Sequence, residues 1–373
     1  MQRHLKLLMA IIVATTYALD AIAQTEIRGK VRDWKTGEPL AFANVYINQT
    51  TLGAAADEKG QFVIHNVPPG NFELKASFVG YETESRKIIA GESAVLEANF
   101  GLNPLSKELT ELEVTGTHDR KWQRKFRQFK REFLGVSPNA SQCEIVNPWV
   151  VEFDEDNPGV WILRATASEP IEIINKALGY RLFFHIRRFE IYKTKIAILG
   201  DTRFEELKSD DEKEKERWNR QRRETWMGSE RHLFYSMLHS RLEEDGFQIY
   251  AEISKNNDLV RSSMFSAELG KRVVPYTVHP QPIGKKIKLY RVPFDGRVEI
   301  HYSGRNDHPF YKDMNGLVSW IETAGQAIDV TDKGVVTDPS RLVTIGYFRS
   351  LRVADLLPLD YEPENLSGGS ARH

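Results

Sequence analysis

The stretch VPPGNFELKASFVGYETESRKI, residues 67–88, carries an apolar residue at alternate positions along its first half. Phe72, Leu74 and Ala76 alternate with polar residues, as expected for a strand, whose side chains point to its two faces in turn. The Pro-Pro-Gly corner at 68–70 combines the fixed φ of proline with the wider freedom of glycine that a tight turn requires. The stretch is therefore expected to reverse the chain and continue as a half-buried strand.

Other short β-prone runs lie on the N-terminal side of this stretch. They recur about every ten residues, a series typical of an all-β sandwich. Turn-forming residues at 35–39 (KTGEP) and 57–60 (DEKG) separate them. The runs are Ile27–Val31, Ala43–Ile47 and Gln61–Ile64. Residues 24–101 are therefore expected to form a β-sandwich domain.

Motifs of this segment together resemble the carboxypeptidase regulatory-like domain, whose fold is prealbumin-like (transthyretin-like). They are G-x-V-x-D at 29–33, Gly37-Glu38-Pro39-Leu40, Ala43-x-Val45, Asp57-x-x-Gly60-x-Phe62, Val67-Pro68-x-Gly70-x-Phe72-x-Leu74 and Gly80-Tyr81. In that family the sandwich is appended to some zinc carboxypeptidases, and it also precedes the plug of TonB-dependent outer-membrane transporters. Neither setting makes the sandwich itself catalytic, so the resemblance implies a mainly β domain without an active site.

The first residues have the pattern of a secretory signal peptide. Basic residues precede an apolar run at about 7–18, and Ala-Ile-Ala at 21–23 provides a small-x-small cleavage site. The run is short for a membrane-spanning helix and is followed by Asp20. We expect residues 1–23 to be removed, the mature chain to have no transmembrane segment, and the protein to be exported to the periplasm or outer membrane of a Gram-negative bacterium.

The composition describes an ordinary globular protein. The 373 residues carry a formal net charge of −1 and 41% hydrophobic residues, so no global field attracts nucleic acid or an anionic membrane. A chain of this length accommodates about two domains. The single cysteine, Cys143, cannot form an internal disulfide and is expected to be a buried thiol rather than a nucleophile.

The polar segment at 102–117 is predicted to be a linker. Residues 118–135, HDRKWQRKFRQFKREFLG, are predicted to form a basic amphipathic helix. Its aromatic residues share one helical face, and Lys and Arg cover the remainder. These aromatics are the candidate interaction or docking residues Trp122, Phe126, Phe129 and Phe133. Gly135 is well placed as a C-cap and strands follow, which favours docking on the second domain. Binding to an anionic membrane or a partner is the alternative.

The rest of the chain shows strand patterns interrupted by one helical region, Asp210–Gly246. This region predicts one helix broken near Gly228-Ser229, or two helices with Ser229 as an N-cap and Gly246 as the stop. The expected strands are Pro148–Phe153, Val160–Ala165, Arg181–Ile186, Ile191–Leu199, Phe247–Ile253, Val273–Val278, Lys286–Val292, Arg297–Tyr302, Val318–Ile321 and Leu342–Phe348.

Motifs of this second half resemble a companion domain found behind the same sandwich in other exported proteins of bacterial envelopes. They are the aromatic pattern of 122–135, NKALGY at 175–180, RHLF at 231–234, EDGF at 244–247 and ADLLPLDY at 354–361. The resemblance implies that residues 118–361 form one unit. From its strand and helix patterns we expect a β-rich α+β domain, and we expect residues 362–373 to be a disordered tail. It implies no biochemical activity.

Local signatures of common enzymes are missing from the sequence. No histidine is followed by an acid at the third position, as in zinc carboxypeptidases, and HExxH, GxSxG and phosphate-binding glycine motifs are absent. His232 and His239 nearly share a helical face, but their apolar neighbours favour structural histidines over a metal pair. We expect no catalytic, cofactor-binding or metal-binding residue. A zinc site would use His232, His239, His301 and His308 first.

Acidic clusters and tryptophans offer weaker signals. The acids at 152–156 suit calcium or a pair of hydrolytic carboxylates, but they fit no EF-hand loop, and the Pro-Gly that follows indicates a solvated turn. The acids at 205–216 alternate with lysines, as on an exposed, ion-paired helix. Trp149, Trp161 and Trp226 are candidates for a sugar-stacking platform, although most such tryptophans lie in cores.

Together these features predict a mainly β protein in which a prealbumin-like sandwich precedes a β-rich α+β domain with one long or broken helix. The expected function is non-catalytic binding or assembly in the cell envelope, with an unknown envelope protein or a glycan as partner. The alternatives are a hydrolase with scattered catalytic residues in the second domain, or a peripheral membrane protein. A pocket of converging carboxylates or histidines would favour the hydrolase, and a shallow apolar surface rimmed by polar groups would favour binding.

Overall fold

The computed structural model describes the greater part of the chain as two compact units. The first reaches to Glu111 without Gln49–Thr51, and the second comprises Gln49–Thr51 and the chain from Leu112 onward. The described residues are 24–91, 93–105, 119–154, 162–192, 196–252, 273–283, 288–294, 296–305, 307–308, 312–313, 316–323 and 327–363. The predicted signal peptide, most of the predicted linker and nearly all of the predicted tail lie outside these residues.

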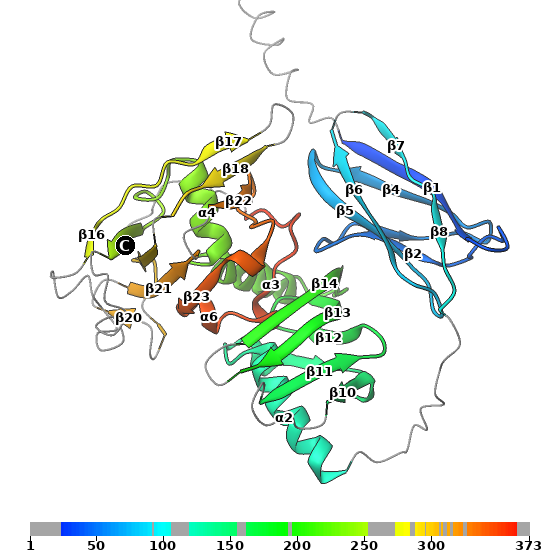
Figure 1. Cartoon of the computed structure of the whole chain (residues 1–373), viewed down its shortest axis with the longest axis horizontal. Coiled ribbons are helices and arrows are strands. Elements are labelled where there is room, and N and C mark those ends of the chain that lie inside the picture. The colour runs from blue at the N-terminus through cyan, green and yellow to red at the C-terminus, as the bar shows by residue number, and fades with distance from the viewer. Residues whose placement is uncertain are drawn as a thin grey trace, which may run out of the picture. The chain divides into compact units, whose positions relative to one another are not determined.

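The first unit is built of two sheets (Figure 1). One has the order β4-β1-β7, with β8 also paired to β1, and the other has the order β3-β2-β5-β6. The strands are β1 (Thr25–Asp33), β2 (Asn44–Ile47), β3 (Gly53–Ala55), β4 (Gln61–Val67), β5 (Gly70–Ser77), β6 (Glu84–Ala90), β7 (Val95–Glu97) and β8 (Phe100–Leu102).

One apolar core fills the space between the two sheets of this unit. Ile27 and Phe62 come from the β4-β1 sheet, Val45 and Leu74 come from the other sheet, and all four side chains are buried. The alternation in β5 places Leu74 and Ala76 in this core as predicted. Lys75 differs from the simple pattern, because it is also buried, with its ammonium group 3.3 Å from the Glu73 carboxylate.

In the second unit, helix α2 (Arg120–Leu134) packs against a sheet of order β10-β11-β13-β12-β9 (Figure 1). Strand β14 extends this sheet by pairing with β13. Asp119 caps α2, because its carboxylate accepts a hydrogen bond from the Trp122 amide at 2.7 Å. The strands are β9 (Cys143–Ile145), β10 (Val151–Phe153), β11 (Leu163–Ala167), β12 (Ile171–Asn175), β13 (Tyr180–Ile191) and β14 (Ile196–Glu206), with 3₁₀ turns η1 (Ala140–Gln142) and η2 (Pro148–Val150).

Two further sheets and two longer helices complete the second unit. The sheets have the orders β16-β15-β19-β21-β20, with β23 on β21, and β17-β18-β22. The two longer helices are α3 (Glu212–Trp226) and α4 (Glu230–Leu238). A short helix α6 (Tyr347–Ser350) and the 3₁₀ turns η3 (Pro339–Arg341) and η4 (Val353–Asp355) follow later in the chain. The strands are β15 (Phe247–Glu252), β16 (Val273–Pro275), β17 (Gln281–Ile283), β18 (Leu289–Val292), β19 (Arg297–Tyr302), β20 (Lys312–Asp313), β21 (Gly316–Glu322), β22 (Ile328–Thr331) and β23 (Val343–Gly346).

The helical region is two helices, and its end differs from the prediction. Ser229 caps α4 by accepting a hydrogen bond from the His232 amide at 3.1 Å. The helix stops at Leu238 rather than near Gly246, because Ser240 adopts a φ of 55° and the following residues form turns. Arg241 stabilises these turns with an ion pair to Asp245 at 3.0 Å.

Most predicted strands differ from the observed ones by a few residues at their ends, and three differ for an identifiable local reason. Ile191–Leu199 is wrong as one strand, because β13 ends at Ile191 and β14 begins at Ile196, with the two ends paired in an antiparallel hairpin. Residues 148–150 form a 3₁₀ turn that starts at a proline. The strand predicted to end at Phe348 ends at Gly346, whose φ of 75° precedes the short helix α6. The fold class itself, mainly β with few helices, is confirmed.

Candidate functional site

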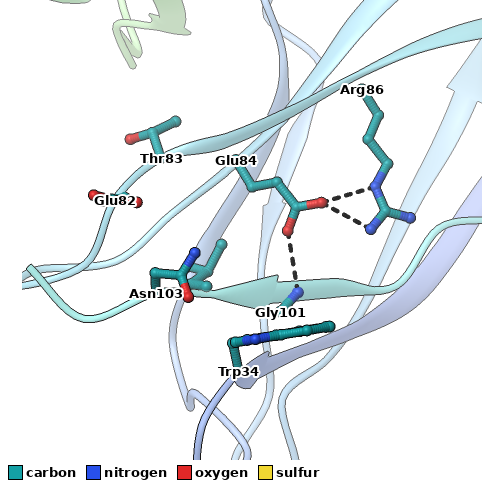
Figure 2. A pocket seen from close by; sticks show the side chains of 8 residues that line it. Trp34, Glu82, Thr83, Glu84, Arg86, Gly101 and Asn103 are labelled. Carbon is teal, nitrogen blue, oxygen red and sulfur yellow. Dashed lines mark hydrogen bonds and ion pairs between the residues drawn. The ribbon is translucent and has the colours of Figure 1, made fainter.

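The candidate site is a hollow of about 320 Å³ in the first unit (Figure 2). It lies where the turn after β1 meets the start of β6 and the end of β8. Its lining combines one aromatic side chain with acidic, basic, amide and hydroxyl groups. The lining residues are Trp34, Glu82, Thr83, Glu84, Arg86, Gly101, Leu102 and Asn103.

Trp34 supplies the aromatic surface of this hollow. Its side chain is 72% exposed although its backbone amide is tied to the Leu102 carbonyl at 2.9 Å. The indole lies over Gly101, where an added Cβ would come within 2.8 Å of Trp34 Cε3. Glycine at 101 therefore lets the ring rest against the backbone of β8, while much of the indole remains open to solvent.

Asp33 holds the turn that carries Trp34. Its Oδ1 accepts hydrogen bonds from the amides of Lys35 at 2.7 Å and Thr36 at 2.9 Å, and its Oδ2 accepts one from the Tyr81 hydroxyl at 2.8 Å. The Thr36 and Tyr81 hydrogen bonds lower the pKa of Asp33, because they stabilise its charged form. The same contact with Asp33 raises the pKa of Tyr81. Asp33 thereby ties the turn after β1 to Tyr81, which comes directly before the lining residues at 82–84.

Glu84 has both carboxylate oxygens occupied. Oε1 accepts two hydrogen bonds from the Arg86 guanidinium, at 3.0 Å from Nε and 2.8 Å from Nη2, and Oε2 accepts one from the Gly101 amide at 3.1 Å (Figure 2). The Arg86 guanidinium also lies 4.9 Å from the centre of the Phe100 ring. A carboxylate bound in this way holds β6 and β8 together at the hollow, and both of its oxygens already have hydrogen-bond partners.

Glu82, Thr83 and Asn103 form the open polar rim of the hollow. All three are exposed, and the Glu82 amide donates to the Asn103 carbonyl at 2.8 Å, which keeps the two segments together. Within the described part of the chain their side chains form no hydrogen bond or ion pair. Their carboxylate, hydroxyl and amide groups are therefore available to a ligand.

The four aromatic residues predicted on α2 lie on the face that meets the second unit's core. Phe129 and Phe133 are fully buried, and Trp122 and Phe126 are half-buried. The Phe129 ring meets Phe189 edge-on at 4.7 Å. The Trp122 indole donates to the Val151 carbonyl at 3.0 Å. These side chains are held inside the unit and do not contribute to the hollow.

The histidines named as first zinc ligands do not gather into a site. His232 is buried, and its Nδ1 accepts a hydrogen bond from the Gly228 amide at 3.0 Å, whereas His239 is exposed and stacks on Tyr235. His301 is buried in β19, and His308 is half-buried beside Tyr347. In the residues that the structure describes, no three His, Cys, Asp or Glu side chains are grouped as metal ligands.

The most enzyme-like cluster of the second unit is fully enclosed. Glu299 accepts a hydrogen bond from the Trp320 indole at 2.9 Å and lies 2.8 Å from Nε2 of His301. All three side chains are buried, and Glu299 has no exposed surface. Cys143 is buried as well, which raises the pKa of its thiol to about 12 and disfavours the nucleophilic thiolate.

The site residue that sequence reasoning missed is Trp34. The tryptophans proposed for sugar stacking lie elsewhere: Trp149 is 59% exposed in η2, Trp226 is buried, and Trp161 is outside the described residues. One signal was available, because Trp34 interrupts an otherwise polar turn directly after a strand. An apolar ring at such a position is not needed for the core, which favours a role at the surface.

None of the described helices is long and apolar enough to cross a bilayer.

The acidic cluster at 152–156, which was predicted to be a solvated turn, lies only partly within the described residues. Within it Asp154 forms an ion pair with Arg164 at 3.2 Å, and the residues from 155 to 161 lie outside the described part.

Three solved structures illustrate the likenesses found for this chain, and all three are distant. The backbone protein of group B streptococcus pilus 2b is 16% identical, with 22% of this chain and 41% of that chain covered. GBS52, a minor pilin of Streptococcus agalactiae, is 14% identical, with 22% and 45% covered. A type II Cohesin-X-Dockerin complex from Acetivibrio cellulolyticus is 22% identical, with 30% and 76% covered. Each has a TM-score of 0.19, which is too low to support an assignment.

Sequence comparison is informative for the first unit. The chain is 32% identical over 93 residues to the TonB-dependent receptor SusC of Bacteroides thetaiotaomicron. The match covers 25% of this chain and only 9% of that receptor. Residues 27–114 match the family described as CarboxypepD_reg-like domain, which is the domain expected from the motifs of the sandwich. The first unit of this protein therefore carries a CarboxypepD_reg-like domain.

Proposed function

We propose that the protein is a non-catalytic binding protein of the bacterial cell envelope, and that its CarboxypepD_reg-like domain holds a sugar ring of a glycan in the Trp34 hollow. The observation that carries this proposal is the exposed indole beside a carboxylate whose oxygens are both hydrogen-bonded. Such a site offers surface and hydrogen bonds to a ligand. It offers no unpaired acid and base placed to act together.

The chemistry of the hollow suits a sugar ring. A pyranose has an apolar face of C–H groups, which the flat indole of Trp34 can cover, and a rim of hydroxyl groups. Hydroxyl groups both donate and accept, and the rim of the hollow offers the Glu82 carboxylate, the Thr83 hydroxyl and the Asn103 amide. A volume of about 320 Å³ is at the small end for a ligand site, which suits one or two rings of a longer glycan.

The rival hydrolase receives less support from the second unit. The Glu299–His301 pair is enclosed, and the pKa of His232 falls to about 4 because burial penalises its charged form. Both groups have structural partners in the described part of the unit. A hydrolase would need converging groups that substrate can reach.

Envelope placement rests on sequence. The predicted signal peptide supports export, and the similarity to part of a TonB-dependent receptor supports placement in the cell envelope. These observations favour a protein that lies in the periplasm or is associated with the outer membrane.

The test compares glycan binding by three proteins: the purified wild type, Trp34→Ala and Trp149→Ala. The last is the matched control, because it removes another exposed indole. We expect a panel of neutral and acidic oligosaccharides to include ligands that bind the wild type and the control equally. Truncating a central tryptophan costs about 2 kcal/mol or more of binding energy, so Trp34→Ala should bind about 30-fold more weakly.

Three outcomes would contradict parts of the proposal. Glycan binding that survives Trp34→Ala would show that the Trp34 hollow is not the glycan site. Capture of an envelope protein through Trp34 without any glycan binding would keep the binding function and overturn the glycan. Turnover of a bound oligosaccharide would overturn the non-catalytic assignment.

A further inference from the structure

Helix α2 concentrates positive charge in a protein that is nearly neutral overall. Its fifteen residues, RKWQRKFRQFKREFL, contain seven Lys and Arg and a single Glu, whereas the whole chain has a formal net charge of −1. The next α-helix along the chain, α3, is different, because Lys215 pairs with Glu212 at 2.7 Å and Arg217 pairs with Glu214 at 3.0 Å. Four Glu offset most of the six Lys and Arg of α3, whereas a single Glu offsets the seven of α2.

The fold presents this charge outward on a rigid support. Phe129 and Phe133 are buried in the core, and the Trp122 indole and the Lys125 ammonium donate to backbone carbonyls of the adjoining β10 segment at 3.0 Å. Arg131 pairs with Glu132 at 2.7 Å. The other cations are exposed and form no ion pair or hydrogen bond with any described residue: Arg120, Lys121, Arg124, Arg127 and Lys130.

A second hollow, of about 350 Å³, lies at the C-terminal end of the same helix. Arg127, Lys130 and Arg131 line it together with apolar groups of Leu134, Val136 and Ala140. Val136 is 72% exposed although it is an aliphatic residue. Cations and an exposed apolar side chain therefore share one concave surface.

We propose that this basic face of α2 docks on a membrane surface rich in anionic phospholipid, with lipid phosphates bound by Arg127 and Lys130. Guanidinium and ammonium groups are the usual partners of phosphate oxygens. The apolar part of the hollow accommodates the carbon portion of a headgroup beside Val136. A soluble polyanion offers no such apolar portion, which is why lipid is the occupant that the site favours.

This docking differs from insertion of an amphipathic helix. The aromatic face that would enter a bilayer is packed inside the protein, so the contact is electrostatic and lies at the headgroup level. Binding should weaken steeply with ionic strength, because salt screens exposed charges over about 10 Å at 0.1 M. The inference does not depend on the glycan proposed for the first unit.

The experiment is co-sedimentation of the purified protein with phosphatidylcholine vesicles, with and without phosphatidylglycerol, at low and high salt. The test variant is Arg127→Glu/Lys130→Glu. The control is Arg220→Glu/Arg223→Glu on α3, which changes net charge equally at exposed positions. Each basic residue near an anionic surface contributes about 1 kcal/mol, so the test variant should bind at least about tenfold more weakly and the control should bind like the wild type.

A second variant separates lipid from other anions. Val136→Asn should weaken vesicle binding while leaving any binding of soluble polyphosphate in place, because it removes the apolar surface of the hollow without changing its charge. Three results would overturn the proposal: no preference for phosphatidylglycerol, equal losses in both charge-reversed proteins, or full displacement by polyphosphate with no effect of Val136→Asn. Unchanged melting temperatures will establish that the variants are folded.

Discussion

Single carboxylates decide what the Trp34 hollow can do. Asp33 receives three hydrogen bonds, two from amides of its own turn and one from Tyr81, and so fixes the backbone that carries the indole. Glu84 is similarly occupied by Arg86 and the Gly101 amide. Charge-assisted hydrogen bonds of this kind are stronger than neutral ones, and they preorganise a surface before any ligand arrives.

His232 makes a residue-scale prediction about pH. Burial lowers its pKa from 6.5 to about 4, so between these values the unfolded chain binds a proton that the folded chain does not. The contribution of His232 to stability is therefore present above pH 6.5 and is lost as the pH falls toward 4, by at most about 1.4 kcal/mol per pH unit.

Urea unfolding of the wild type and His232→Gln between pH 7 and pH 4.5 will measure this contribution. The variant is expected to be less stable at pH 7, and the gap should narrow as the pH falls because glutamine does not titrate. Other carboxyl groups titrate in the same range, so the readout is the difference between the two proteins. Parallel pH profiles would show that His232 is protonated equally in both states.

At the scale of elements, α2 combines two faces with different tasks. The aromatic face packs on the β10–β14 sheet, where Phe129 contacts Phe189 and Phe133 contacts Phe184, both edge-on. The opposite face carries the unpaired cations. Docking on the second domain and binding to a membrane were competing interpretations of one helix. The structure packs the aromatic face inside the unit, and the membrane contact that we propose uses the opposite face, so the two interpretations no longer exclude each other.

Phe129→Ala tests the packed face. Truncating a fully buried phenylalanine costs about 3 to 5 kcal/mol through lost apolar contact and the cavity left behind. Calorimetry should show a clear drop in the melting temperature of the second unit. Trp149→Ala, which removes an exposed ring from the same unit, should leave it almost unchanged. A small effect at Phe129 would mean that the helix leaves the sheet in solution.

At the scale of the whole molecule, the two proposed surfaces belong to different units. The Trp34 hollow lies in the CarboxypepD_reg-like unit, and the basic face lies in the second. Variants in separate regions with no shared partners usually act additively. Trp34→Ala is therefore expected to leave vesicle binding intact, and Arg127→Glu/Lys130→Glu to leave glycan binding intact.

Export is a prediction about the first 23 residues of the sequence. The Ala-Ile-Ala site at 21–23 predicts cleavage after Ala23, so the mature protein should begin at Gln24 or at its cyclised form. Mass spectrometry of the protein recovered from the envelope fraction will give this mass directly. An intact N-terminus in that fraction would contradict the cleavable signal.

Local patterns were sufficient for much of the fold. The alternation in residues 72–76 predicted β5, the aromatic spacing predicted α2 within two residues at its start, and Ser229 was correctly identified as an N-cap. Each of these depends on residues a few positions apart, whose periodicity is set by the geometry of one strand or one helix. The hairpin between β13 and β14 was missed because apolar residues continue through the reversal.

The sequence by itself therefore determined the sandwich, its CarboxypepD_reg-like motifs, and the amphipathic character of α2. Only the tertiary structure decided that Trp34 stands beside Gly101 and near the Glu84–Arg86 pair, since these residues are far apart along the chain. It also decided which charges of α2 remain unpaired. The reason is physical: periodicity reports which side of an element is apolar, whereas a site requires side chains from several elements to converge, and that convergence is set by non-local strand pairing.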